Sequence, residues 1–142
     1  MFCRFLLAVS VMFVAGTAVV GCATERSPAP MDANVFFINL KDGDVVSSPF
    51  TVRFGIKGMK VVPAGVKKKN TGHHHLLIDV RNPSFDITIK KDEQHRHFVK
   101  GQTETTLKLS PGKHSLQLLL GDHEGRPHDP AVRSKKITIT VK

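Results

Sequence analysis

Short runs of alternating apolar and polar residues, separated by glycine and proline, limit most strongly how this chain can fold. In the clearest run, residues 50, 52, 54 and 56 are apolar and the residues between them are polar or small. Because successive side chains of a strand point to opposite faces, this pattern predicts a half-buried strand. Further strands are expected at 35–40, 76–80, 86–90, 97–99, 103–109, 114–120 and 136–142.

Turn residues separate these runs. Lys41-Asp42-Gly43-Asp44 and Ser110-Pro111-Gly112-Lys113 are typical of tight turns, and residues 58–70 and 121–130 form longer polar loops. The pattern shows no amphipathic helix after residue 21. It therefore predicts an all-β domain over residues 35–142, an antiparallel β-sandwich of immunoglobulin-like build. The Cys–Trp–Cys pattern of antibody domains is missing, so only the architecture is implied.

The first residues have the character of an export signal. Arg4 precedes an apolar run over residues 5–20, which is short for a membrane-spanning helix. The sequence V-V-G-C at 19–22 resembles the lipobox of bacterial lipoproteins. The resemblance implies a signal peptide over 1–21, cleavage before Cys22, lipid on its sulfur and a polar tether over 22–34. The alternatives are a plain signal peptide and an uncleaved anchor.

Location and charge limit the partners. A lipidated Cys22 implies a cell-envelope protein facing the periplasm, and Ala23 favours the outer membrane of a Gram-negative cell. The formal net charge of +9 should draw the chain to anionic headgroups or polysaccharide, whereas export argues against nucleic acid. Lys67-Lys68-Lys69 is the densest basic cluster, and a solvated loop is its simplest interpretation. With Cys3 in the signal and Cys22 lipidated, the domain has no thiol for a disulfide, a metal or catalysis.

Three consecutive histidines enter the strand-like segment T-G-H-H-H-L-L-I-D-V at 71–80. If the segment is extended, His74 shares a face with Leu76 and Ile78, which is the expected core face. His73 and His75 then lie on the opposite face and can share one metal ion. A bulge would exchange these faces, and the sequence does not decide between the two.

The histidine segment belongs to a wider resemblance. G-H-H-H-L-L-I-D at 72–79, H-F-V-K-G-Q-T-E at 97–104, P-G-K-H-S-L-Q-L-L-L-G-D at 111–122 and P-H-D-P at 127–130 resemble the bacterial DUF4399 family, whose function is unassigned. The resemblance runs from about Asp42 and implies that eight residues belong to family motifs, namely His73, His74, His75, His97, His114, Asp122, His123 and His128. Related sequences often carry another histidine where this chain has Gly125.

A transition-metal site is the main functional hypothesis. Neutral imidazole suits copper and zinc, and three or four nitrogen or oxygen ligands are enough. The expected ligands are His73, His75, His97, His123 and His128. His74 and His114 are expected at the core edge, where they would orient neighbours by hydrogen bonds, and Asp79 and Asp122 are expected to hold imidazoles in position. His95 shares a face with His97 but lies outside the stronger motif, so it ranks below the others.

Two other classes of function compete with metal binding. The first is an envelope interaction module without metal, whose basic, histidine-rich loops bind an anionic polymer or a partner protein. The second is a metal hydrolase, with Asp79 or Glu104 as general base. No Gly-x-Ser-x-Gly elbow is present, and the spacing requires no catalytic site. The sequence therefore favours a protein that is not an enzyme, which binds or buffers copper or zinc in the cell envelope.

Overall fold

The computed structural model describes residues 25–142, and the expected signal peptide and Cys22 lie outside this range. The described residues form strands and loops, and none of them builds a helix that is long and apolar enough to cross a membrane. The strands are β1 (Asn34–Phe37), β2 (Val45–Val46), β3 (Phe50–Lys57), β4 (Lys60–Val61), β5 (Thr71–Ile78), β6 (His95–His97), β7 (Glu104–Leu107), β8 (Gly112–Gly121) and β9 (Ile137–Val141).

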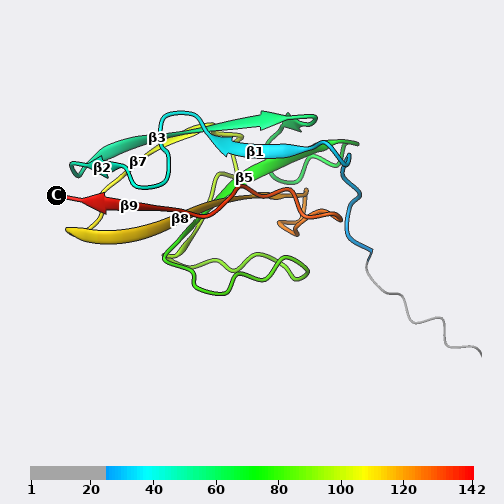
Figure 1. Cartoon of the computed structure of the whole chain (residues 1–142). Helices are drawn as coiled ribbons and strands as arrows, with labels where there is room; N and C mark the ends of the chain where they lie inside the picture. Colours follow the sequence, from blue (N-terminus) through cyan, green and yellow to red (C-terminus); the bar gives the residue numbers. More distant parts are fainter. Residues whose placement is uncertain (1–24) are drawn as a thin grey trace, which may run out of the picture.

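The strands make two layers (Figure 1). The smaller sheet has the order β1-β3-β7, and both of its pairs are antiparallel. The larger sheet has the order β2-β9-β8-β5-β4, and β6 pairs with β5 beside β4. The long pairs β5–β8 and β8–β9 are antiparallel, whereas the two-residue strands β2 and β4 pair in parallel. The predicted all-β sandwich is confirmed, with these short parallel additions.

The main core lies between the two sheets. Val35, Val52 and Phe54 of the smaller sheet pack against the inward residues of β5, β8 and β9, such as Leu76 and Leu118. Each of these side chains is at most 3% exposed. The alternation from Phe50 onward therefore does what the sequence predicted, because it places one side of β3 against the larger sheet.

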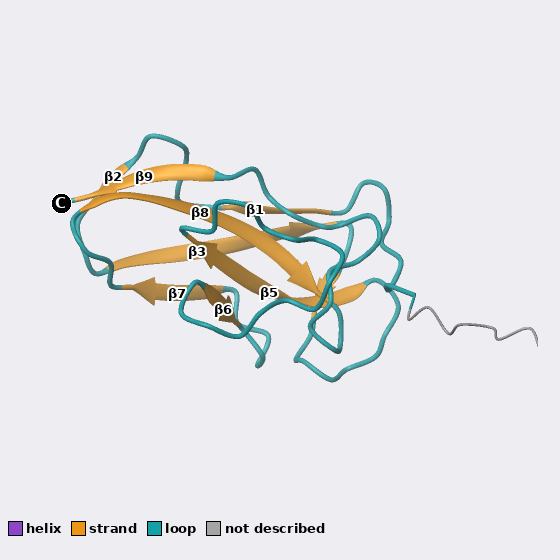
Figure 2. Cartoon of the chain, turned by 90° about the horizontal axis from the view of Figure 1, so that it is seen from below, coloured by secondary structure: helices purple, strands orange, loops and turns teal. Residues whose placement is uncertain are grey.

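The outer face of the larger sheet is also partly covered. The loop over 79–94, between β5 and β6, runs across this face. Figure 2 shows the larger sheet from below. Ile89 packs on Leu77 and Leu119, and its backbone N–H donates to the Gly125 carbonyl at 2.9 Å. A second, smaller apolar cluster therefore holds the loop over 79–94 against the sheet and against the loop over 122–134.

Several local predictions were wrong. Residues 86–90 were expected as a strand, but they belong to this covering loop, where the buried Ile89 packs on the sheet. The loop expected over 58–70 contains β4. The segment over 26–29, whose composition offers little to pack, is held against the domain by an ion pair between Arg26 and Asp129 at 3.1 Å and by a bridge between Pro28 and Asp129.

Candidate metal centre

Strand β5 positions the three consecutive histidines without a bulge. Its register with β8 is regular, pairing His73 with Gly121, His74 with Leu120 and His75 with Leu119. All eight residues of β5 are buried, because sheets, loops or both cover its two faces. His74 faces the main core, with its ring centroid 5.2 Å from that of Phe54. His73 and His75 lie on the opposite face, as the extended reading of the sequence predicted.

Strand β6 brings a third imidazole to the same place. His97 pairs in register with His75, and the Nε2 atom of His75 lies 3.1 Å from the Nδ1 atom of His97. The rings of His73 and His75 have centroids 4.5 Å apart. One potential ligand atom from each of His73, His75 and His97 lies within 4.8 Å of the other two. These three residues, called the histidine trio below, could hold a metal ion.

A glycine makes room for the trio. Gly121 lies on β8 beside His75, and a β-carbon at that position would overlap the imidazole, coming within 3.0 Å of Nδ1 and closer still to Cε1. Any larger residue at 121 would therefore displace the His75 ring. Gly121 was not among the predicted site residues, although a glycine that ends the apolar run L-L-L at 118–120 is a signal for a close approach.

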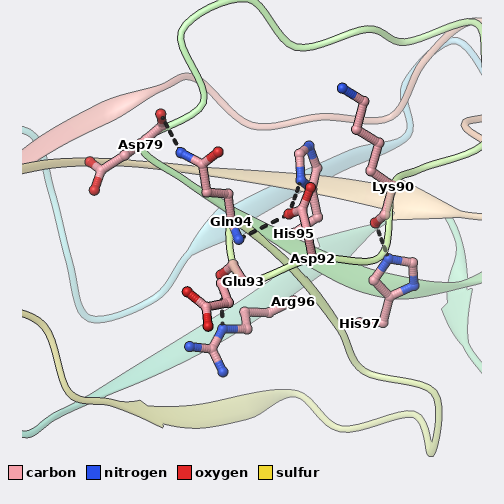
Figure 3. A network of polar contacts seen from close by, with 8 residues as sticks. All are labelled: Asp79, Lys90, Asp92, Glu93, Gln94, His95, Arg96 and His97. Carbon is pink, nitrogen blue, oxygen red and sulfur yellow. Dashed lines mark hydrogen bonds and ion pairs between the residues drawn. The ribbon is translucent and has the colours of Figure 1, made fainter.

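The backbone of the covering loop orients His97. Its Nε2 atom lies 2.5 Å from the carbonyl oxygen of Lys90, as Figure 3 shows. A carbonyl oxygen can only accept, so Nε2 must carry the proton and the neutral ring presents an unprotonated Nδ1. Metal-binding histidines are commonly held in this way by a carbonyl or carboxylate on their second nitrogen. No sequence pattern pointed to Lys90, because only its main chain is used.

Burial keeps the imidazoles of β5 neutral. Loss of solvation lowers the pKa of His75 to about 2, with His73 and His97 acting in the same direction. Loss of solvation also lowers the pKa of His73, and His97 and His128 add to this while the Asp122 carboxylate opposes it. Both rings are therefore uncharged at neutral pH, which is the form that binds metals.

The histidines of the loop over 122–134 lie beside the trio but outside it. His128 is 1% exposed, and its Nε2 donates to the Thr71 carbonyl at 3.2 Å, while its Nδ1 has no partner in residues 25–142. His128 acts electrostatically on His73, where it helps to lower the pKa of that imidazole. The Nε2 atom of His123 lies 3.9 Å from the Glu124 carboxylate. The structure therefore gathers three of the five expected ligands.

Asp122 caps its own loop and does not position an imidazole by a hydrogen bond. Its carboxylate accepts hydrogen bonds from the Ser27 hydroxyl at 2.8 Å and from the backbone N–H groups of Glu124 and Arg126. Burial acts to raise the pKa of Asp122, but these hydrogen bonds outweigh it, so the pKa is lowered overall. The charged carboxylate of Asp122 acts on His73 only by electrostatic attraction, without a hydrogen bond.

His114 and Asp79 lie at the other end of the larger sheet. The Nδ1 atom of His114 is 2.7 Å from the Asp79 carboxylate, and its Nε2 is 2.8 Å from the Ser110 carbonyl. The hydrogen bond to Asp79 raises the pKa of His114. Asp79 therefore orients an imidazole, but that imidazole is remote from the trio, so Asp79 does not take the expected place behind a ligand of the trio. His74 makes no comparable contact, because neither of its ring nitrogens has a partner among the described residues, contrary to the expectation.

His95 is next to the trio, although the sequence ranked it below the other histidines. It shares a face of β6 with His97, and its Nδ1 lies 2.6 Å from the Asp92 carboxylate (Figure 3). Its strand partner is Leu77, two pairs further along β5 from His75. His95 is therefore close to His97, but it is not one of the three histidines whose ligand atoms approach one another.

Fold and site together define a class, an all-β sandwich domain with a cluster of three imidazoles, two of them buried, on the outer face of its larger sheet. The sequence matches the family described as a domain of unknown function, DUF4399, over residues 52–142. The chain belongs to that family, and the matched region contains the whole trio. No curated protein and no solved structure matches the chain.

Proposed function

We propose that this protein is a lipid-anchored protein of the cell envelope that binds or buffers a transition metal, copper or zinc, at His73, His75 and His97. The observation that carries the proposal is the approach of three imidazole nitrogens from two strands to within 4.8 Å of one another. Two of the three side chains are at most 2% exposed. Burying polar rings in this way is costly unless their nitrogens find partners.

The spacing of two of the nitrogens, those of His75 and His97, suits one shared ion. Two imidazole ligands of a tetrahedral zinc, each about 2.0–2.1 Å from the metal, lie about 3.3 Å apart. The 3.1 Å separation between His75 Nε2 and His97 Nδ1 needs little adjustment to reach that value. Without metal, the same two atoms share one hydrogen bond. The Nδ1 atom of His73 is buried and has no partner within residues 25–142, so it is a polar group that a bound ion could satisfy.

The donor set favours a site that exchanges its metal. Three neutral nitrogens without thiolate suit zinc or copper and leave a coordination position for water or another molecule. His97 is only partly buried, whereas His73 and His75 are buried, so His97 provides the side from which an ion can enter. These features support binding and buffering.

Catalysis has less support than binding. Glu104, one general base considered from the sequence, pairs with Arg53 on the smaller sheet at 3.4 Å. Asp79, the other, is bonded to His114 at the far end of β5. Neither carboxylate is beside the trio, where a general base would have to activate a metal-bound water. We therefore propose that the protein is not an enzyme.

Calorimetric titration of the purified protein with Zn(II) and Cu(II) tests the metal proposal. The wild type should bind one equivalent, and the His73→Ala/His75→Ala variant should lose that binding. His123→Ala is the matched control, because it removes a histidine of the neighbouring loop, and it should bind as the wild type does. Equal weak heats from the wild type and the double variant would refute the proposal. The non-metal interaction module would then be the better explanation, and chelation should leave its stability unchanged.

A further inference from the structure

The three consecutive lysines lie beside the point where the N-terminal segment joins the domain. Lys67, Lys68 and Lys69 are exposed, and they line a cavity of about 270 Å³ together with Ser27 and Pro28. The sequence alone favoured a solvated loop here, because it could not show that residues 27 and 67 are neighbours. This juxtaposition gives the lysine cluster a defined position relative to the proposed lipid anchor.

The length of chain between anchor and domain is short. Arg26 is fixed by its ion pair with Asp129, and the Ser27 hydroxyl by its hydrogen bond to Asp122. Arg26 follows Cys22 by four residues. Even a fully extended chain covers at most about 14 Å over that length. A lipid on Cys22 would therefore keep this end of the domain, and the lysines with it, close to the headgroups.

The three lysines supply the positive charge at this end. Two neighbouring carboxylates are paired with arginines, whereas Asp122 keeps its negative charge in the same cavity and Glu25 is exposed beside Arg26. Asp129 pairs with Arg26, and Asp122 accepts three hydrogen bonds. Glu124 lies 3.7 Å from Arg126. The three lysines have no such partner among the described residues. The residue before them, Val66, is 41% exposed and offers an apolar side chain at the same tip.

We infer that residues 66–69 dock on anionic phospholipid headgroups of the membrane that holds the anchor. This inference rests on the lipidation part of the proposed function. An exposed valine beside three lysines is suited to such a surface, since the ammonium groups meet phosphate charge and the apolar side chain enters the interface. Each lysine near an anionic membrane favours the docked state by about fivefold at low salt. Replacing all three should lower the ratio of docked to undocked protein by roughly a hundredfold.

Site-directed fluorescence on the full lipidated protein tests the inference. The mature chain has no thiol other than Cys22, so Val66→Cys allows a single polarity-sensitive label at the loop tip. The protein is reconstituted in vesicles of phosphatidylcholine alone or mixed with phosphatidylglycerol. Lys113→Cys carries the control label at the opposite end of β8 (Figure 1).

We expect the label at 66 to shift to the blue, and to be quenched by brominated lipid, only in vesicles that contain phosphatidylglycerol. About 0.5 M salt, which shortens the screening length, should reverse the effect, and so should the substitutions Lys67→Ser, Lys68→Ser and Lys69→Ser. The label at 113 should not respond. Equal signals in both kinds of vesicle, or equal responses at 66 and 113, would overturn the inference. It would also be overturned if the label at 66 responded to a soluble anionic polysaccharide and not to the vesicles.

Mass spectrometry of the same preparation separates the two ways in which this account can fail. A mature protein without lipid on Cys22 would refute the proposed anchor, and the inference with it. A lipidated protein whose loop does not respond to anionic vesicles would refute only the docking of residues 66–69. The metal proposal stands apart from both outcomes, because it depends on the histidine trio.

Discussion

Replacing His74 by leucine should remove one part of the acid sensitivity of the metal-free protein, the part that comes from this one ring. His74 is fully buried in the main core beside Phe54, and its two ring nitrogens have no partner within residues 25–142. Loss of solvation, aided by the neighbouring His73, lowers its pKa from 6.5 to about 4. A histidine that binds its proton more weakly when folded contributes stability above pH 6.5, and that stability is lost as the pH falls toward 4.

The size of the effect follows from the two pKa values. The pKa of His74 is 6.5 in the unfolded chain and about 4 in the folded protein. Lowering the pH from 7.5 to 5 should therefore reduce the free energy of unfolding by about 2 kcal/mol through this one ring. Leucine is close in size to histidine and cannot take up a proton. At pH 7.5 the free energy of unfolding of the variant should therefore lie within about 1 kcal/mol of that of the wild type. At pH 5 it should be the more stable protein by about 2 kcal/mol relative to that baseline.

Urea unfolding in the presence of a chelator measures both values. Circular dichroism is the suitable probe, since the chain has no Trp and no Tyr. The other buried histidines of β5 also lose stability in acid, so the wild type is compared with His74→Leu at each pH rather than with a fixed reference. A stability difference that is the same at pH 7.5 and pH 5 would show that His74 titrates normally in the folded protein, and the reasoning would fail.

Three further predictions concern other parts of the structure. His114→Gln should lower the free energy of unfolding by about 1 kcal/mol more at pH 5.5 than at pH 9. The reason is that the hydrogen bond to Asp79 raises the pKa of His114, so the stabilisation is present below pH 6.5 and is lost as the pH rises through the folded pKa. Urea titrations at both pH values measure the difference, and an equal loss at both would contradict the prediction. Gly121→Ala should destabilise the domain by about 1–3 kcal/mol through overlap with the His75 ring. Combining it with His75→Ala should recover most of that loss, whereas additive losses in the double variant would rule out the overlap. Adding Zn(II) at a hundred times its dissociation constant should stabilise the wild type by about 2.7 kcal/mol and leave His73→Ala/His75→Ala unchanged in thermal unfolding, with equal shifts counting against the trio.

Alternation along the sequence was enough to predict the main strands. β3, β8 and β9 lie where the pattern placed them, because one side of each must reach the core. The same rule assigned His74 to the core and His73 to the outer face. It failed for residues 86–90, where Ile87 and Ile89 alternate as in a strand. Only Ile89 packs on the sheet, and Ile87 is exposed in the covering loop.

The composition of the trio needed tertiary structure. His97 joins it through the register of β6 on β5, which no local pattern fixes. His123 and His128 are five residues apart in one loop, and the path of that loop, not its composition, leaves both outside the group. Lys90 and Gly121 contribute a carbonyl oxygen and the absence of a side chain, respectively, and neither contribution leaves a clear mark in residue type.

The most direct test of the central claim follows the histidine ring nitrogens themselves. Long-range proton–nitrogen correlation spectra of the protein, recorded before and after one equivalent of Zn(II), resolve which imidazoles bind. The account predicts that signals of His73, His75 and His97 shift to values typical of metal-bound nitrogen, while those of His95, His114 and His123 keep their positions. Spectra in which the trio is unchanged, or in which the exposed histidines shift instead, would contradict it.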